Sequence, residues 1–347
     1  MKIKDLAYFG WQIGRMHLQS NYRVPLCLYI VLTNRCNNHC LYCRTHDLPQ
    51  DDKWTTENLK SVILEMKRCG TRRIHLTGGE PMLRSDIGQL ITYAKKLGFF
   101  VSMVTNGYQV SKRIEELKDI DVVFLSYDGP PEVHGQLRGK KNTEEVKSAL
   151  FALKSSGVRV WTTTVLTKLN ADFIEEIVKF AEENNILANF NPLEFTLDPS
   201  HSLHPYYGEI KDLILTDRER RNAFQKLIDL KLSGSPIGSS LSYLRIALGW
   251  FYNQRTISPL PSKYYRCWAG KAWGHLDFDG KLYSCGWDML RNKTGISVLD
   301  KGFESAWNKL NFSSDCNSCS HACGVENNLI FSLKFPAIWN GLKHLSF

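Results

Sequence analysis

Several features that would place a protein in a class at once are missing from this sequence. No run of about 18 uncharged apolar residues occurs, so no membrane-spanning helix is predicted. Lys2, Lys4 and Asp5 interrupt the start of the chain, where a secretory signal would need an unbroken apolar segment. No block of about five or six like charges is present, which argues against a nucleic-acid-binding tail. These absences predict a protein of the reducing cytoplasm.

The overall composition is that of a globular protein. Of 347 residues, 43% are hydrophobic and 23% are charged, which excludes intrinsic disorder, collagen and coiled coil for the whole chain. At about 100–200 residues per domain, this length indicates about two domains. The net charge of +9 favours acidic partners, such as a reductant protein, an anionic lipid surface or a phosphorylated substrate. The same charge also fits a basic surface that is simply solvated.

Short apolar runs alternate with helical periodicity between residues 26 and 196. Residues 26–33 have the length and β-branching of a buried strand, and residues 55–69 carry apolar side chains at helical spacing. Ser85 is expected to cap the next helix. About six strand-then-helix units are predicted, and such units place parallel strands side by side. A complete (β/α)₈ barrel needs about 250 residues, so this shorter segment predicts an α/β fold with a partial, open (β/α)₆ TIM-like barrel.

Composition also divides the rest of the chain. We expect an amphipathic N-terminal segment (1–25), the barrel (26–196), a helical bridge (197–262), a small cysteine-containing domain (263–325) and an amphipathic C-terminal tail (326–347). Residues 274–285 predict a hairpin, because Asp279-Gly280 lies between two alternating runs. Both terminal segments are apolar, aromatic and basic, which is typical of helices that lie in a membrane interface. They also fit helices that pack on the barrel.

Most of the cysteines fall in two clusters, and the first is Cys36, Cys40 and Cys43, in the loop predicted after the first strand. In a reducing compartment such clustering indicates metal ligation and not disulfides. Three thiolates can hold three irons of a [4Fe–4S] cluster and leave the fourth iron open for a substrate or cofactor. The alternative is structural zinc, with His39 or His46 as the fourth ligand.

The segments around this cluster resemble the radical S-adenosylmethionine (radical SAM) superfamily. CNNHCLYC at 36–43 matches its Cx₃CxΦC motif, with Tyr42 at the aromatic position, and TGGEP at 77–81 matches its GGEP motif. The resemblance covers about residues 26–195. It implies that a [4Fe–4S] cluster on Cys36, Cys40 and Cys43 cleaves SAM reductively, and that the resulting 5′-deoxyadenosyl radical removes a hydrogen from a substrate.

The resemblance also implies a set of SAM-binding residues. TNG at 105–107 resembles a family segment, and so does SYDG at 126–129 together with His134 and Arg138. Glu80 would bind the ammonium group of SAM through a charge-assisted hydrogen bond. Taken alone, each later segment is also an ordinary turn or cap. The predicted set is Gly78, Gly79, Glu80, Pro81, Asn106, Ser126, Asp128, Arg138 and Thr164, with Thr163 and Asn170 beside it.

The second cluster consists of Cys267, Cys285, Cys316, Cys319 and Cys323. It resembles the C-terminal SPASM/twitch extensions of radical SAM enzymes. The resemblance implies one auxiliary [4Fe–4S] cluster, with the first four cysteines as ligands and Cys323 as a spare or a replacement. A zinc ribbon is the alternative. Asp288 lies where relatives place a proton-accepting carboxylate, and a solvated aspartate is the plainer interpretation.

The function implied is that of a radical SAM enzyme, of oxidoreductase or transferase type, that tailors a small molecule or a lipid in biosynthesis. One alternative is a maturase that modifies a peptide or protein side chain, and another is a non-enzymatic zinc-binding scaffold. An acidic electron donor such as a flavodoxin or ferredoxin is expected, and nucleic acid is not. The expected location is the cytoplasm, with peripheral contact at the inner face of the membrane if the terminal segments bind lipid.

Overall fold

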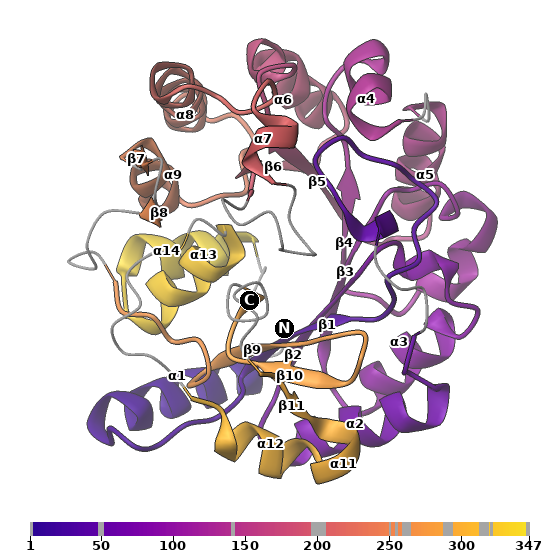
Figure 1. The fold of residues 1–347 in the computed structure, drawn as a ribbon, viewed down its shortest axis with the longest axis vertical. Helices are drawn as coiled ribbons and strands as arrows, with labels where there is room; N and C mark the ends of the chain where they lie inside the picture. Colours follow the sequence, from indigo (N-terminus) through magenta and orange to yellow (C-terminus); the bar gives the residue numbers. More distant parts are fainter. Residues whose placement is uncertain are drawn as a thin grey trace.

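A nine-stranded sheet organises the protein, in the strand order β11-β10-β9-β1-β2-β3-β4-β5-β6 (Figure 1). The computed structural model describes residues 3–47, 52–139, 143–195, 206–249, 251–253, 256–258, 265–286, 294–311, 319 and 322–344. Neighbouring strands from β1 to β6 all pair in parallel, and helices connect them. This arrangement confirms the predicted open (β/α)₆ barrel.

The strands and helices have the following bounds. The strands are β1 (Cys27–Val31), β2 (Arg73–Thr77), β3 (Phe100–Thr105), β4 (Val122–Ser126), β5 (Arg159–Leu166), β6 (Leu187–Pro192), β7 (Phe251–Asn253), β8 (Thr256–Ser258), β9 (Trp273–Leu276), β10 (Lys281–Tyr283) and β11 (Ile296–Ser297). The α-helices are α1 (Ile3–Leu18), α2 (Thr56–Arg68), α3 (Ile87–Lys96), α4 (Pro131–Arg138), α5 (Thr143–Ser155), α6 (Ile174–Glu183), α7 (Tyr207–Ile210), α8 (Asp217–Leu232), α9 (Leu241–Leu248), α11 (Val298–Lys301), α12 (Phe303–Lys309), α13 (Ala322–Phe331) and α14 (Phe335–His344). Short 3₁₀ segments are η1 (Thr45–Asp47), η2 (Pro81–Leu83), η3 (Ser111–Leu117) and η4 (Ala171–Phe173).

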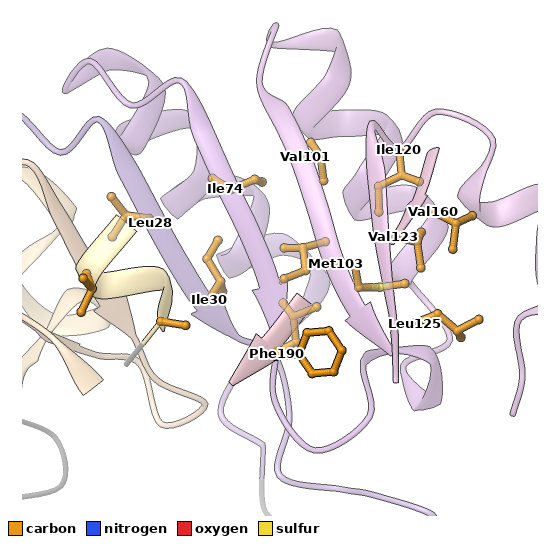
Figure 2. Close-up of a cluster of buried hydrophobic side chains, with 14 of the residues drawn as sticks. Leu28, Ile30, Ile74, Val101, Met103, Ile120, Val123, Leu125, Val160 and Phe190 are labelled. Atoms are coloured by element: carbon orange, nitrogen blue, oxygen red, sulfur yellow. The ribbon is translucent and has the colours of Figure 1, made fainter. Parts of the chain in front are cut away.

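The main core lies between the outer face of the sheet and the surrounding helices. Alternate residues such as Leu28 and Ile30 of β1 and Met103 of β3 point to this face, as Figure 2 shows. They pack against the apolar faces of α2, α3, α5 and α6. The residues between them, among them Tyr29 and His75, therefore point to the opposite face, into the hollow of the barrel.

The predicted helix cap at Ser85 is wrong. α3 begins at Ile87, after Asp86. The Asp86 carboxylate does not cap the helix, because it accepts hydrogen bonds from Arg84 at 2.8 and 2.7 Å and from Thr56 at 2.6 Å. A buried arginine thus decides how this segment begins, and such a partner is not visible in local sequence.

The predicted late hairpin is present, and it continues the barrel sheet. β9 and β10 are antiparallel on either side of Asp279-Gly280, where Gly280 adopts a positive φ of 80°. β9 also pairs in parallel with β1, so that Leu28 lies opposite Gly274. The hairpin therefore extends the sheet beyond its first strand, next to the loop that carries Cys36, Cys40 and Cys43.

The C-terminal helices occupy the hollow of the curved sheet, as Figure 1 shows for α13 and α14. Asn327 of α13 donates a hydrogen bond to the Tyr29 hydroxyl at 3.0 Å, and the His344 ring of α14 lies 6.0 Å from the Trp161 ring. α1 packs through Phe9, Ile13 and Met16 into a cluster that includes Trp268 and Phe331. One face of each terminal helix therefore packs on the barrel. Within the described ranges, no helix has both the length and the hydropathy that a membrane span requires.

Candidate functional site

The early cysteines lie together in the loop that follows β1. Cys36, Cys40 and Cys43 are each half-buried. A turn closes between Cys40 and Cys43, where the Cys43 N–H donates to the Cys40 carbonyl at 3.0 Å. The Leu41 N–H donates to the Leu137 carbonyl at 2.8 Å, which fixes the loop to the end of α4.

The electrostatics of these thiols show that they share one environment. Burial raises the pKa of Cys40 to about 12, with Arg138 lowering it and Cys43 and Cys36 raising it further. Burial likewise raises the pKa of Cys36, and Glu80 and Cys43 add to the effect. Without a metal the buried thiols therefore favour their neutral form, and bound iron would hold them as thiolates.

The spacing of these donors bears on the kind of metal site. Within the described residues, no three cysteine, histidine, aspartate or glutamate side chains lie close enough to share one ion. A zinc ion needs its sulfur ligands to close around one point, at about 2.3 Å from each. A [4Fe–4S] cluster instead takes each thiolate on a different iron. Three thiolates are the donor set that three irons of such a cluster take.

The two glycines after β2 allow the next loop to lie against the cysteine loop. A Cβ on Gly78 would lie 2.4 Å from the Thr33 carbonyl oxygen, and one on Gly79 would lie 2.2 Å from that of Arg35. Gly78 also has a positive φ of 141°. In return, the Gly79 N–H donates to the Thr33 carbonyl at 2.7 Å and the Glu80 N–H donates to that of Arg35 at 2.8 Å. Glycine is required here because backbone meets backbone.

Glu80 is almost fully buried, at 1% exposure, and its carboxylate is held from three sides. One oxygen accepts from the Met82 N–H at 2.9 Å and the Thr105 hydroxyl at 2.7 Å. The other oxygen accepts from the Asn106 N–H at 2.7 Å. Burial raises the pKa of Glu80, and these hydrogen bonds oppose that rise. Pro81 follows as the first residue of η2. The motifs at 77–81 and 105–107 are thereby joined at one carboxylate.

A second buried group centres on Asp128, which is fully inaccessible. Its carboxylate accepts hydrogen bonds from Arg138 at 2.8 Å, from the Val165 N–H at 3.0 Å and from the Tyr42 hydroxyl. Burial alone lowers the pKa of Arg138, but Asp128, Tyr42 and Cys40 outweigh it, so that the pKa is raised. A permanent positive charge therefore lies beside the cysteine loop.

The other predicted SAM-binding residues lie at the carboxyl ends of neighbouring strands. Ser126 ends β4, opposite Thr163 of β5. The Thr164 hydroxyl is buried and donates to the Tyr127 carbonyl at 2.6 Å, whereas Thr163 lines a cavity inside the barrel. Asn170 is buried and donates to the carbonyls of Asp128 and Val165. Of the two threonines, Thr163 is the one that faces the hollow.

The cavity inside the barrel has a volume of about 320 Å³. Its walls combine strand residues such as Tyr29, Arg73 and His75 with Cys323 of α13. The Tyr29 ring stacks on the His275 ring, with 4.7 Å between the ring centres. Burial raises the pKa of the Tyr29 hydroxyl well above its usual value of 10. Sequence analysis did not single out Tyr29, Arg73 or His75. Polar side chains at alternate positions of β2 are the signal that could have found the last two.

The structure describes four of the five late cysteines, since Cys316 lies outside the described residues, as does Asp288. Cys267 and Cys285 pack against the cluster around Trp268 and Trp273. Cys319 is buried, and its sulfur lies 3.0 Å from where a Cβ on Gly324 would be. Gly324 also lies against Trp273, so Cys319 lies near the same region, while Cys323 lines the barrel cavity.

Known proteins resemble this chain in sequence and in fold. Residues 30–182 match the model of the Radical SAM superfamily. Mycofactocin maturase MftC of Mycolicibacterium smegmatis is 25% identical over 296 residues, which cover 82% of this chain and 70% of that protein. The solved structure of Streptococcus suis SuiB bound to S-adenosylmethionine has the same fold, with a TM-score of 0.67, 17% identity and coverage of 86% of this chain and 69% of SuiB. The structure of anSMEcpe with AdoMet and the Cp18Cys peptide has a TM-score of 0.60 at 20% identity, and the match covers 82% of this chain and 80% of that one.

Proposed function

We propose that the chain is a radical SAM enzyme that cleaves SAM reductively and removes a hydrogen from a substrate held in the barrel cavity. The match of residues 30–182 to the Radical SAM superfamily model supports this proposal. The observation that carries the proposal is the connection between the cysteine loop and Glu80. The Glu80 N–H is bonded to the Arg35 carbonyl, and the Glu80 carboxylate raises the pKa of Cys36. A site for three irons and a site for an ammonium group therefore adjoin.

Cys36, Cys40 and Cys43 would hold a [4Fe–4S] cluster. When bound, the cluster and SAM supply reductive cleavage and a 5′-deoxyadenosyl radical. Arg138 lowers the pKa of both Cys36 and Cys40, so it favours the thiolates that iron requires. The Tyr42 hydroxyl and Arg138 both bind Asp128, which positions this charge beside the loop.

Glu80 would bind the amino group of SAM. Each carboxylate oxygen can accept about two hydrogen bonds. The oxygen that receives the Asn106 N–H therefore has capacity for an ammonium donor. The fixed bonds from Met82, Thr105 and Asn106 orient the carboxylate before the ligand arrives, which reduces the entropy lost on binding.

We propose a peptide or protein side chain as the substrate. Support comes from the relatives, because SuiB has been crystallised with its precursor peptide SuiA and anSMEcpe with the Cp18Cys peptide. The cavity is wide enough for a side chain, and its lining mixes aromatic rings with Arg73 and Asn191. A small molecule or a lipid is the alternative substrate class. The net charge of +9 supports an acidic protein as the electron donor.

We also propose an auxiliary cluster on the late cysteines. Support comes from Cys267 and Cys285, which pack against the cluster that contains Trp268 and Trp273, and from Cys319, which lies beside Gly324 next to Trp273. Cys323 lies in the cavity wall, where a ligand would connect the auxiliary cluster to bound substrate. Asp288 and Cys316 remain predictions from the sequence.

The test is anaerobic reconstitution with iron, sulfide, SAM and dithionite, with 5′-deoxyadenosine and iron as the readouts. Cys36→Ala is expected to abolish 5′-deoxyadenosine formation and to lower the iron from about eight to about four per chain. Cys69→Ala is the matched control, because Cys69 is half-buried outside both clusters and caps α2 through its backbone N–H, which alanine keeps. Undiminished SAM cleavage in a Cys36/Cys40/Cys43 triple alanine variant would overturn the assignment.

A further inference from the structure

The outer face of α14 is apolar and exposed in the part of the chain that the structure describes. Phe335, Trp339 and Leu342 follow one another at helical spacing, and Phe335 and Trp339 are 71% and 60% exposed. Their rings stack at 6.3 Å. The opposite face of the helix, with Ala337 and Gly341, is buried against the barrel. Isolated exposed apolar residues are common, but a stacked aromatic pair on one continuous face is typical of an interaction surface.

This apolar face continues onto α1. The His17 ring nitrogen lies 2.8 Å from the Phe331 carbonyl oxygen, so the end of α1 adjoins the turn between α13 and α14. Leu18, next to His17, is 87% exposed, and Leu333 in the turn is also exposed. Further along α1, Trp11 is exposed as well. We call these residues the α1–α14 strip, which comprises Trp11, Arg15, Leu18, Leu333, Lys334, Phe335, Trp339, Leu342 and Lys343.

Positive charge predominates around the strip. Residues 6–18 and 327–344 contain no aspartate or glutamate, while Arg15, Lys334 and Lys343 lie within the strip. The Trp11 ring lies 6.4 Å from Tyr8, which lines a groove together with Lys67 and Arg72. The full set of cations along that groove is Lys4, Lys67, Arg72, Lys95 and Lys96, against Asp5 and Asp121. The strip therefore runs from a basic groove to an aromatic helix face.

We propose that the α1–α14 strip docks the protein on an anionic lipid bilayer. Aromatic and aliphatic side chains flanked by lysine and arginine are the composition of helices that lie in the headgroup region. Tryptophan is enriched at this depth, and each nearby cation adds attraction to anionic headgroups. A second copy of the chain is a poorer occupant, because two such strips would bring Arg15, Lys334 and Lys343 against their own counterparts without acidic partners.

Co-sedimentation of the full chain with vesicles tests the proposal. We expect binding to vesicles of phosphatidylglycerol and phosphatidylcholine, and weaker binding to phosphatidylcholine alone. Phe335→Ser/Trp339→Ser should lose binding to both. Lys334→Gln/Lys343→Gln should weaken binding to the anionic vesicles by about 25-fold, since one cation near the surface contributes about fivefold, and the difference should shrink in high salt.

Phe151→Ser is the matched control. Phe151 is 74% exposed, on α5 at the opposite side of the fold from α1 and α14, so the variant removes one exposed aromatic ring elsewhere (Figure 1). It should bind like the unmodified chain. Circular dichroism establishes that each variant is folded, and their exposed positions predict that it is. Two results would overturn the proposal. The first is vesicle binding by Phe335→Ser/Trp339→Ser that equals that of the unmodified chain. The second is a lipid-free dimer in sedimentation velocity that the unmodified chain forms and this variant does not.

Discussion

Replacing Gly79 by alanine tests the connection between the cysteine loop and the turn after β2. A Cβ at this position would lie 2.2 Å from the Arg35 carbonyl oxygen and 2.7 Å from that of Asn34. Both contacts are to backbone atoms, so no side-chain rotation can relieve them. The two loops would have to separate.

The expected cost follows from what the separation breaks. The Gly79 N–H bond to Thr33 and the Glu80 N–H bond to Arg35 would be lost, at about 0.5–1.5 kcal/mol each. Overpacking of a close contact adds about 1–3 kcal/mol. The free energy of unfolding should therefore fall by about 2–6 kcal/mol. Because Glu80 moves with this loop, the variant should also retain less iron and bind SAM more weakly.

Denaturant unfolding followed by circular dichroism measures the change, and iron analysis after reconstitution measures the second effect. Gly10→Ala is the control, since nothing lies within 4 Å of a Cβ at this exposed position of α1. There alanine should add up to about 1 kcal/mol of stability. If Gly79→Ala unfolds at the same denaturant concentration as the unmodified chain and keeps its iron, the close approach of the loops is not what requires glycine.

Two further predictions concern buried carboxylates. Burial raises the pKa of Asp277 from its usual 3.8 to about 7. The folded state therefore favours the protonated carboxyl. Its contribution to the free energy of unfolding is fully present below about pH 4 and is lost as the pH rises through 7. Asp277→Asn should therefore raise the free energy of unfolding at pH 8, by at most about 4 kcal/mol, and should leave it unchanged near pH 4; a difference that does not depend on pH would contradict this. Asp128→Asn leaves Arg138 buried without its counter-charge and should cost about 3–5 kcal/mol. Adding Arg138→Met should restore part of that loss in the same denaturant assay, and no recovery would show that the pair is not the cause.

The barrel could be predicted from the sequence because its signals are local. Each strand is an apolar run of the right length, and each helix carries an apolar stripe, as in residues 55–69, where α2 begins after its Thr55 cap. The cysteine loop and the turn at 77–81 could be predicted to meet, because both follow neighbouring parallel strands. Two of the three hydrogen bonds that fix Glu80 come from Thr105 and Asn106 at the end of β3, and only the folded sheet brings β3 alongside.

The parts of the fold that could not be predicted depend on contacts between segments that are distant in the sequence. Nothing local to residues 273–276 indicates that this strand pairs with β1, since the pairing joins Cys27 to Trp273. The terminal segments show helical amphipathicity, but their sequence does not distinguish the face that packs on the barrel from the face that is exposed. Phe331 at the end of α13 is buried and Phe335 at the start of α14 is exposed, although only three residues separate them in the sequence.

The position of α13 connects the late cysteines with the substrate cavity. Asn328 accepts hydrogen bonds from the Trp268 N–H at 2.8 Å and the Trp273 ring N–H at 3.0 Å, so the helix is fixed to the hairpin. The preceding residue, Asn327, binds the Tyr29 hydroxyl in the cavity wall. Cys323 is the second residue of this helix, and Cys319 precedes the helix by three residues in the sequence. Ligation of either thiol would therefore restrain a helix that lines the cavity, so an auxiliary cluster in this fold would shape the space for substrate as well as exchange electrons.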